Sequence, residues 1–467
     1  MDSSKLADRL RGILNPAGVV CRSGQVPRAS DTDLEHILGG RWHQHAYGAC
    51  FVVERRTGAR TMYGRAPVGE LAARLRGAAA EAPLIAGGAP ARPPFLFFDL
   101  ETTGLSGGAG TFAFLVGCGS FDEEGGFITR QYMLLRFIDE RALLTTVAGE
   151  LARAGAIVSF NGKSFDAPVL ETRYLFHRLE WVGAWLPHVD VLHPARRFWG
   201  NGGVRGPRGS TGSPRPERAE RVEGREGHES CSLVSLERQV LGAERISDVP
   251  GFEIPARYFQ FVRSGDARPL TAVLEHNRLD LLSLAGVTAR LVHLVRSGPE
   301  EARDAREALA LGHLYARAGL DGRARAAFSR AANASIAPAT GSMHGAASIA
   351  GTAASIAVSA ASIAAIRIDA LRALALTLRR GRQYDEAAGC WRQLLDVGGC
   401  PRHIAREATE ALAIHHEHRA RDLAAARAFA LQSLESGMPS AWNQAVQHRL
   451  ARIERKMASV RRPGFFS

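Results

Sequence analysis

The sequence contains few cysteines and no apolar stretch typical of a secretion signal. Its six cysteines are scattered along 467 residues, without a CxxC pair or a histidine pair at zinc-ligand spacing. This distribution argues against a structural zinc site and fits a reducing cytoplasm. The first residues, MDSSKLADRLRGIL, mix charged and apolar side chains and lack the apolar run of a signal peptide.

Asp, Glu, Lys and Arg are absent from residues 334–366, a segment long enough to span a bilayer. Ala, Ser and Gly make up most of this segment, and only a few Ile add apolar character. The motif ASIA recurs in it, which favours a low-complexity insertion over a membrane helix. We therefore expect a soluble, cytoplasmic protein without membrane contact.

Acidic residues are outnumbered by basic ones in this chain. The 47 Asp and Glu face 59 Lys and Arg, which gives a formal net charge of +12 and a pI near 10.0. Such a balance favours a polyanionic partner such as nucleic acid, although an arginine-rich composition can also reflect genome bias. The apolar fraction of 46% is typical of globular proteins, and the length indicates two to four domains.

The apolar pattern predicts an α/β domain in the first two thirds of the chain. Residues 1–90 form an N-terminal segment of unknown role, with a strand expected over CFVVE, and end in the Gly/Pro-rich stretch GGAPARPP. From residue 91 to residue 298 we predict alternating strands and helices, the first three strands forming an antiparallel meander. The predicted strands are 95–100, 112–119, 127–135 and 156–160, and the predicted helices are 139–154, 165–178 and 270–296.

Two further segments complete the predicted organisation. Residues 200–230 interleave Gly, Pro, Arg and Glu with almost no large apolar side chain, so we predict a disordered insertion. Residues 299–467 follow a tetratricopeptide-like pattern, which predicts an all-α region of paired helices that binds a protein partner. Two copies of the pattern, aligned at Ala324 and Ala387, lie 63 residues apart, and the low-complexity insertion 334–366 accounts for the excess. The positions that carry the first copy are Leu311, Gly312, Tyr315, Ala324, Phe328 and Ala331.

The stretch FLFFDLETTGL, residues 95–105, places two carboxylates at the end of a buried strand. Because side chains alternate along a strand, Asp99 and Glu101 share one face, roughly 6–7 Å apart. Their repulsion is about 2.5 kcal/mol at an effective dielectric constant of about 20. A cation between them would relieve it, and oxygen ligands at this spacing suit Mg²⁺ or Mn²⁺. The alternative is a strand end whose carboxylates reach solvent.

Further polar residues in the same α/β segment strengthen the metal interpretation. Asp166 stands at the start of a predicted helix, just after the turn signal Asn161-Gly162. His276 and Asp280 lie four residues apart on the last predicted helix and therefore on one face. Taken singly, each has a structural explanation, since an Asp before a helix is often its N-cap. Their joint occurrence in one segment favours a site.

These motifs resemble the DEDD exonuclease branch of the ribonuclease H-like superfamily. More narrowly, the chain is similar to the bacterial YprB-type proteins, in which tetratricopeptide repeats follow the nuclease domain. The first family motif is met by Asp99, Glu101, Thr102, Thr103 and Gly104, the second by Asn161, Phe165 and Asp166, and the third by His276 and Asp280. The third motif departs from the family, because it combines a His residue with the three-residue spacing that accompanies Tyr elsewhere.

The resemblance implies a metal-dependent 3′→5′ exonuclease acting on DNA or RNA with two Mg²⁺ or Mn²⁺ ions. Asp99 would bridge the ions, Glu101 and Asp280 would hold the ion that activates water, and Asp166 would help to hold the other. His276 would orient or deprotonate the water. The residues implied to contact the terminal nucleotide are Thr102, Thr103, Leu105 and Asn161.

Two other functions are compatible with parts of the sequence. A nucleic-acid-binding module of the same fold, scaffolded by the repeats and with little catalysis, would need no intact metal site. All four carboxylates are present, which favours catalysis over this alternative. A phosphatase with an aspartyl nucleophile would need a second Asp where Glu101 stands, and it would leave His276 and Asp280 without a role.

Overall fold

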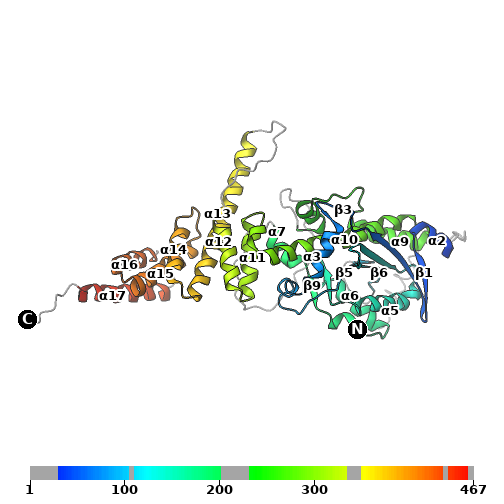
Figure 1. Ribbon diagram of the computed structural model, residues 1–467, viewed down its shortest axis with the longest axis horizontal. Helices are drawn as coiled ribbons and strands as arrows, with labels where there is room; N and C mark the ends of the chain where they lie inside the picture. Colours follow the sequence, from blue (N-terminus) through cyan, green and yellow to red (C-terminus); the bar gives the residue numbers. More distant parts are fainter. Residues whose placement is uncertain (1–29, 105–109, 201–230, 334–348, 435–439, 461–467) are drawn as a thin grey trace, which may run out of the picture.

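The computed structural model describes residues 30–104, 110–200, 231–333, 349–434 and 440–460. These residues form a sheet-containing part and a row of helices that extends away from it (Figure 1). Apart from Gly200, the insertion predicted to be disordered, residues 200–230, lies outside the described residues.

The sheet has seven strands in the order β1-β2-β7-β6-β5-β8-β9. Strands β5, β6 and β7 form the predicted antiparallel meander, and β8 and β9 extend the sheet in parallel with β5. The strands are β1 (Arg41–His45), β2 (Gly48–Thr57), β5 (Phe95–Thr102), β6 (Ala113–Phe121), β7 (Phe127–Met133), β8 (Ala156–Ser159) and β9 (His188–Asp190); β3 (Met62–Tyr63) and β4 (Ala66–Pro67) form a separate hairpin.

The N-terminal segment contributes directly to the sheet. Strand β2, which includes the predicted strand CFVVE, pairs with β7 in antiparallel register from Phe51 opposite Met133 to Thr57 opposite Phe127. Strand β1 then pairs with β2 and forms the edge of the sheet. The sheet thus includes strands from both sides of the Gly/Pro-rich stretch at 87–94.

Helices cover both faces of the sheet and create two apolar cores. Phe95 and Phe97 of β5 pack in one core with α3 and much of α10, whereas Leu96 and Phe98 pack in the other with α5 and α6. This alternation follows from the two-residue period of a strand. The helices of this part are α2 (Asp31–Leu38), α3 (Val68–Arg76), α4 (Ala82–Ile85), α5 (Glu140–Leu151), α6 (Asp166–Phe176), α7 (Leu192–Trp199), α8 (Leu233–Leu236), α9 (Ile254–Ser264) and α10 (Arg268–Ser297).

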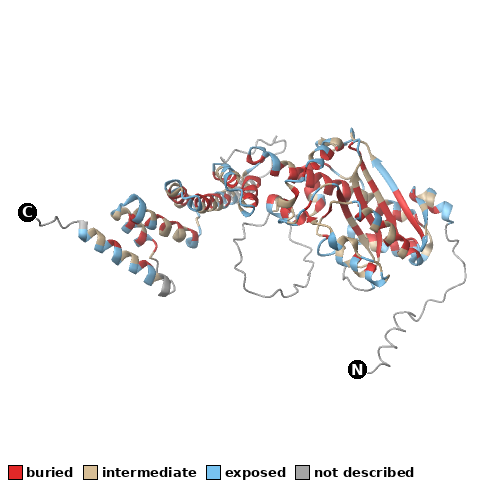
Figure 2. Ribbon diagram, turned by 60° about the horizontal axis from the view of Figure 1, so that its bottom comes forward, coloured by how far each residue is buried: buried red, intermediate tan, exposed pale blue. Residues whose placement is uncertain are grey.

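The C-terminal part is helical, and each helix contacts the next along the chain. Small residues allow close approach: Gly312 of α11 faces the ring of Phe328 of α12, where a Cβ atom would overlap the ring. Buried residues lie on the inner faces of these helices (Figure 2). The helices are α11 (Ala305–Arg317), α12 (Asp321–Asn333), α13 (Ile349–Arg380), α14 (Tyr384–Leu395), α15 (Arg402–His415), α16 (Leu423–Gln432) and α17 (Ser440–Val460).

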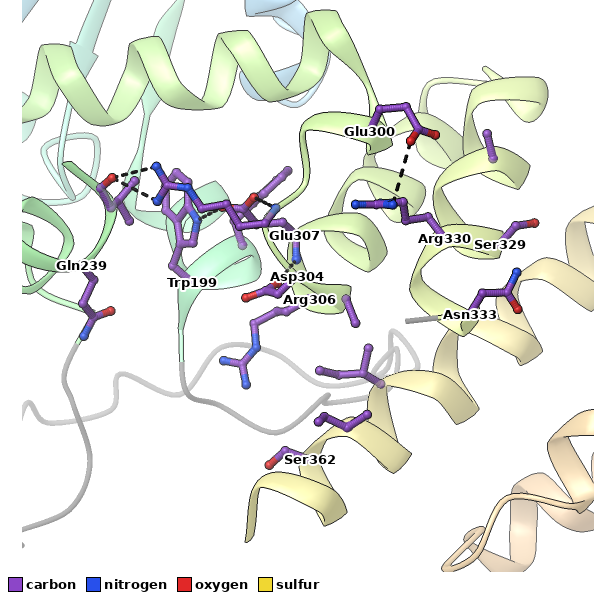
Figure 3. A pocket seen from close by; sticks show the side chains of 17 residues that line it. Trp199, Gln239, Glu300, Asp304, Arg306, Glu307, Ser329, Arg330, Asn333 and Ser362 are labelled. Atoms are coloured by element: carbon purple, nitrogen blue, oxygen red, sulfur yellow. Dashed lines mark hydrogen bonds and ion pairs between the residues drawn. The ribbon is translucent and has the colours of Figure 1, made fainter. Parts of the chain in front are cut away.

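The two parts meet through α7, α10 and α11, around a buried carboxylate (Figure 3). Glu307 of α11 accepts hydrogen bonds from the indole Nε1 of Trp199 and from Arg290 Nη2, both at 2.8 Å. Beside this contact lies a cavity of about 1180 Å³, whose wall includes Trp199, Gln239, Arg306, Ser329 and Arg330.

The described part of the low-complexity segment is helical. Residues 349–366 belong to α13, which projects beyond its neighbours in Figure 1. Within the described ranges, no helix is both long and apolar enough to cross a membrane. The five cysteines described, at positions 50, 118, 231, 390 and 400, are unpaired thiols.

Candidate active site

Strand β5 places Asp99 and Glu101 on the face that α10 covers. Both continue the row of Phe95 and Phe97, and both side chains are half-buried. The Oδ2 atom of Asp99 accepts a hydrogen bond from Asn277 Nδ2 at 2.8 Å, so β5 and α10 are joined at the candidate site. A register shift between Glu101 and Thr102 ends the regular pairing with β6 there.

Asp166 reaches the site from the turn after β8. Asn161 adopts a left-handed conformation with φ of 69°, as the turn signal predicts. At Gly162 a Cβ atom would lie 2.6 Å from Asp166 Oδ2. Any residue other than glycine at this position would therefore overlap the carboxylate and displace it. Phe165, rather than Asp166, occupies the N-cap position of α6, so capping does not explain the acidic residue.

Helix α10 contributes His276 and Asp280 from one face, as the spacing predicts. His276 Nε2 lies 3.5 Å from Asp280 Oδ2, and Asp280 Oδ1 accepts a hydrogen bond from Arg245 Nη2 at 2.5 Å. The ring is held from its other side, because Nδ1 lies 2.7 Å from Asp248 Oδ1 and donates to it. Asp280 therefore turns one oxygen towards Arg245 and the other towards His276.

Burial and neighbouring negative charges disfavour the charged forms of Asp99, Glu101 and Asp166. Burial raises the pKa of Asp99 well above its usual value, and the charges of Asp280, Glu101 and Asp166 raise it further. Burial and the charges of Asp280, Asp166 and Asp248 have the same effect on the pKa of Glu101. Burial, with a contribution from Asp190, raises the pKa of Asp166 to about 7. The fold thus gathers negative charge from β5, α6 and α10 at one place.

The donor set fits a hard divalent cation. All four candidate ligands are carboxylates, the oxygen donors that Mg²⁺ and Mn²⁺ prefer. A cation would also remove the repulsion that raises these pKa values. Across the described residues, no three His, Cys, Asp or Glu side chains are already gathered at ligand spacing around one point.

Thr102 and Thr103, two of the residues predicted to contact substrate, follow Glu101 in the chain and form hydrogen bonds at the end of β5. Thr102 Oγ1 donates to the carbonyl of Gly104 at 3.0 Å. Thr103 Oγ1 accepts from the amide of Phe112 at 3.0 Å, so it ties the two ends of the loop after β5 together. The amide of Asn161 donates to Asp190 Oδ1 at 2.8 Å. Leu105 lies outside the described residues.

Sequence reasoning missed the polar residues that hold the predicted ones in place: Asn277, Arg245, Asp248 and Asp190. Asn277 follows His276 and lies on the apolar face of α10, where the structure buries it fully. The apolar periodicity of this helix could therefore have indicated it. Asp190, at the end of β9, accepts hydrogen bonds from three backbone amides after β8 and β9. Arg245 and Asp248 lie in an irregular loop, where no periodicity indicates which side chains point inward.

Comparison with known proteins indicates that the sheet-containing part has a ribonuclease H-like fold. Residues 96–292 match the family model of the RNase_H superfamily. The chain is also similar to the uncharacterized protein YprB of Bacillus subtilis (strain 168), with 31% identity over 224 residues. That alignment covers 47% of this chain and 47% of the relative, so the chain matches about half the length of this curated relative.

Proposed function

We propose that the protein is a metal-dependent nuclease, specifically a 3′→5′ exonuclease, because residues 96–292 match the family model of the RNase_H superfamily. One observation carries this proposal: Asp166 of α6 and Asp280 of α10 lie near enough to Asp99 and Glu101 of β5 that their charges raise the pKa of both β5 carboxylates. A structural role would not favour this arrangement, since the charges of Asp166 and Asp280 raise the free energy of the charged forms of Asp99 and Glu101.

The four carboxylates would hold two Mg²⁺ or Mn²⁺ ions. Bound divalent ions supply a nucleophile from water at neutral pH and neutralise the charge of the in-line transition state. His276 contributes a ring nitrogen, Nε2, that can take the proton of the attacking water, because Nδ1 already donates to Asp248. Thr102, Thr103, Leu105 and Asn161 would hold the terminal nucleotide of DNA or RNA.

A nucleic-acid-binding module with little turnover is the second candidate. The observation that favours it is the ion pair between Arg245 and Asp280, because a metal ion would have to share Asp280 with a guanidinium. The helical part then acts as a scaffold that presents the module to a protein partner. In the nuclease proposal, the same tetratricopeptide-like surface recruits that partner to the enzyme.

A single digest separates these candidates. End-labelled single- and double-stranded DNA and RNA are incubated with the protein in Mg²⁺, Mn²⁺ or EDTA. A 3′→5′ exonuclease gives shortening of 5′-labelled strands that requires metal, whereas a binding module shifts the same strands on native gels without shortening them.

The substitution Asp99→Asn tests the site itself. It keeps the shape of the side chain but removes a negative charge that would hold the metal ions, so we expect cleavage to fall more than about 100-fold, beyond the loss typical of outer-shell partners. The matched control is Asp266→Asn, since Asp266 forms its own ion pair with Arg268 at the start of α10. Full activity of Asp99→Asn, measured on the same strands, would refute the assignment.

A further inference from the structure

His276 is held by a carboxylate that no family motif includes. Asp248 lies in the loop before α9, and its Oδ1 atom accepts the Nδ1 proton of His276 at 2.7 Å. Asp248 carries a negative charge, because hydrogen bonds from His276 and Arg245 outweigh burial and lower its pKa. A carboxylate on Nδ1 fixes the ring plane and leaves Nε2 as the free nitrogen on the opposite side.

Arg245 fixes Asp248 relative to the metal-ligand candidates. Its side chain is only 4% exposed, and each of three nitrogen atoms meets a different carboxylate. Nε contacts Glu237 Oε2 at 2.7 Å, Nη1 contacts Asp248 Oδ2 at 2.9 Å, and Nη2 contacts Asp280 Oδ1 at 2.5 Å. A planar guanidinium therefore sets the spacing between Asp248 and Asp280, the two carboxylates on either side of His276.

The network continues into the N-terminal segment. Ser283 Oγ donates to Glu237 Oε2 at 2.7 Å, and the hydroxyl of Tyr63, on β3, lies 2.5 Å from Ser283 Oγ. The hairpin of β3 and β4 is itself held in place, since the amide of Arg65 donates to the carbonyl of Leu241. Tyr63, which precedes residue 91, is thus connected to the Arg245 guanidinium through Ser283 and Glu237.

We propose that Asp248 and Arg245 are positioning residues of the nuclease reaction. Asp248 sets the tautomer and orientation of His276 so that Nε2 faces Asp280, and Arg245 sets the position of Asp248. This inference rests on the proposed function. When water attacks the phosphorus and the bond to the 3′ oxygen breaks, the water's proton moves to Nε2. The Nδ1 proton stays on the ring, the imidazolium lies against the Asp248 carboxylate, and the leaving oxygen takes a proton from solvent.

A direct metal-binding role for Asp248 is the competing explanation, because its charge raises the pKa of Glu101. The contacts favour positioning: Oδ1 accepts from His276 and Oδ2 accepts from Arg245, so each of its oxygens already has a cationic or ring N–H partner. The amide of Val249 also donates to Oδ1, so three of the roughly four lone-pair sites of this carboxylate already accept hydrogen bonds.

A double-mutant cycle separates the two roles. In single-turnover digests with enzyme in excess over strand, we expect Asp248→Asn to lower the maximal cleavage rate about 10–100-fold, with little change in the enzyme concentration that gives half of that rate. In a His276→Ala background, the same change should have no further effect, because the residue it positions is missing. Equal losses in both backgrounds, or no loss in either, would overturn the proposal. Asp266→Asn serves as the matched substitution, and thermal unfolding of each variant checks the fold.

The orientation of the ring can be measured without metal or substrate. The protein is labelled with ¹⁵N-histidine, treated with EDTA and studied by NMR. The ring nitrogen signals of His276 are identified as those that are missing from the spectrum of His276→Gln. We expect a proton on Nδ1 and a free Nε2 at alkaline pH, and the opposite tautomer would overturn the proposal. If the wild-type protein cleaves no strand, the nuclease function fails while this measurement still decides whether Asp248 fixes the ring.

Discussion

Three acidic side chains at the candidate site bind protons more tightly in the folded protein than in the unfolded chain. Burial and neighbouring carboxylates raise the pKa of Asp99 and Glu101, and burial raises that of Asp166 to about 7. A carboxyl group whose pKa is raised by folding stabilises the fold below its unfolded pKa of about 4. That contribution is lost as pH rises through the folded value. The metal-free protein should therefore lose stability between about pH 4 and about pH 7.

Replacing Asp166 with Asn should stabilise the metal-free protein at alkaline pH. The neutral amide keeps the shape and removes one charge from the cluster, so we expect a gain of about 1–3 kcal/mol, or a few degrees in Tm, at pH 8 in EDTA. Scanning calorimetry between pH 5 and 8 would measure this gain. Mn²⁺ should raise the Tm of the wild type more than that of the variant.

Asp266→Asn is the control, and it should lower the stability, because hydrogen bonds from Arg268 lower the pKa of Asp266 to about 2. Identical curves for Asp166→Asn and wild type would contradict the electrostatic account.

The candidate ligands could be predicted from the sequence, whereas the loop residues that hold His276 and Asp280 could not. Asp99 and Glu101 follow an apolar strand, and His276 and Asp280 share a helix face, so local periodicity indicates their direction. Arg245 and Asp248 lie in a loop, and their contacts with His276 and Asp280 span 28 to 35 residues. Such contacts depend on tertiary packing, which a local pattern does not encode.

The secondary structure follows the same division between local and long-range information. The predicted helix 139–154 is observed as Glu140–Leu151, and the predicted helix 270–296 as Arg268–Ser297, because apolar spacing fixes both. Strand β2 was expected, but its pairing with β7 was not, since the two strands are separated by about 70 residues of chain. Helix α13 extends into the Ala/Ser/Gly-rich segment, where helix propensity alone allowed no prediction.

The close packing of α11 against α12 predicts that Gly312 cannot be enlarged. A Cβ atom at this position would overlap the ring of Phe328. We expect Gly312→Ala to lower the free energy of unfolding by about 1–3 kcal/mol, despite the better helix propensity of Ala. Gly389, within α14, is the matched control because it faces open space, and Gly389→Ala should raise stability by about 0.5–1 kcal/mol. Urea unfolding of both variants would measure this contrast, and stabilisation by both would show that the ring moves aside.

At the scale of the whole molecule, one of the two apolar cores beside the sheet continues into helices α11 to α15. Phe97 of β5, Leu291 of α10 and Leu311 of α11 belong to the same continuous cluster of buried side chains. The hydroxyl of Tyr315 also donates to the carbonyl of Val295, near the end of α10. The sequence predicted two kinds of structure but not this junction, because the contacts between them join residues from separate patterns. We infer that the two parts unfold together.

Glu307 provides the test of that coupling. Its carboxylate is buried at the junction, where it accepts from Trp199, Arg290 and the amide of Arg303, each at 2.8 Å. Glu307→Gln keeps the shape but leaves the Arg290 charge without its partner, so we expect a loss of about 2–3 kcal/mol. Calorimetry should then show one transition for the wild type and one transition at lower temperature for the variant. Glu300→Gln is the control, because the Glu300 side chain is 83% exposed and should leave the Tm unchanged. Two separate transitions, with only the helical part shifted by Glu307→Gln, would mean that the shared core does not couple the sheet to the helices.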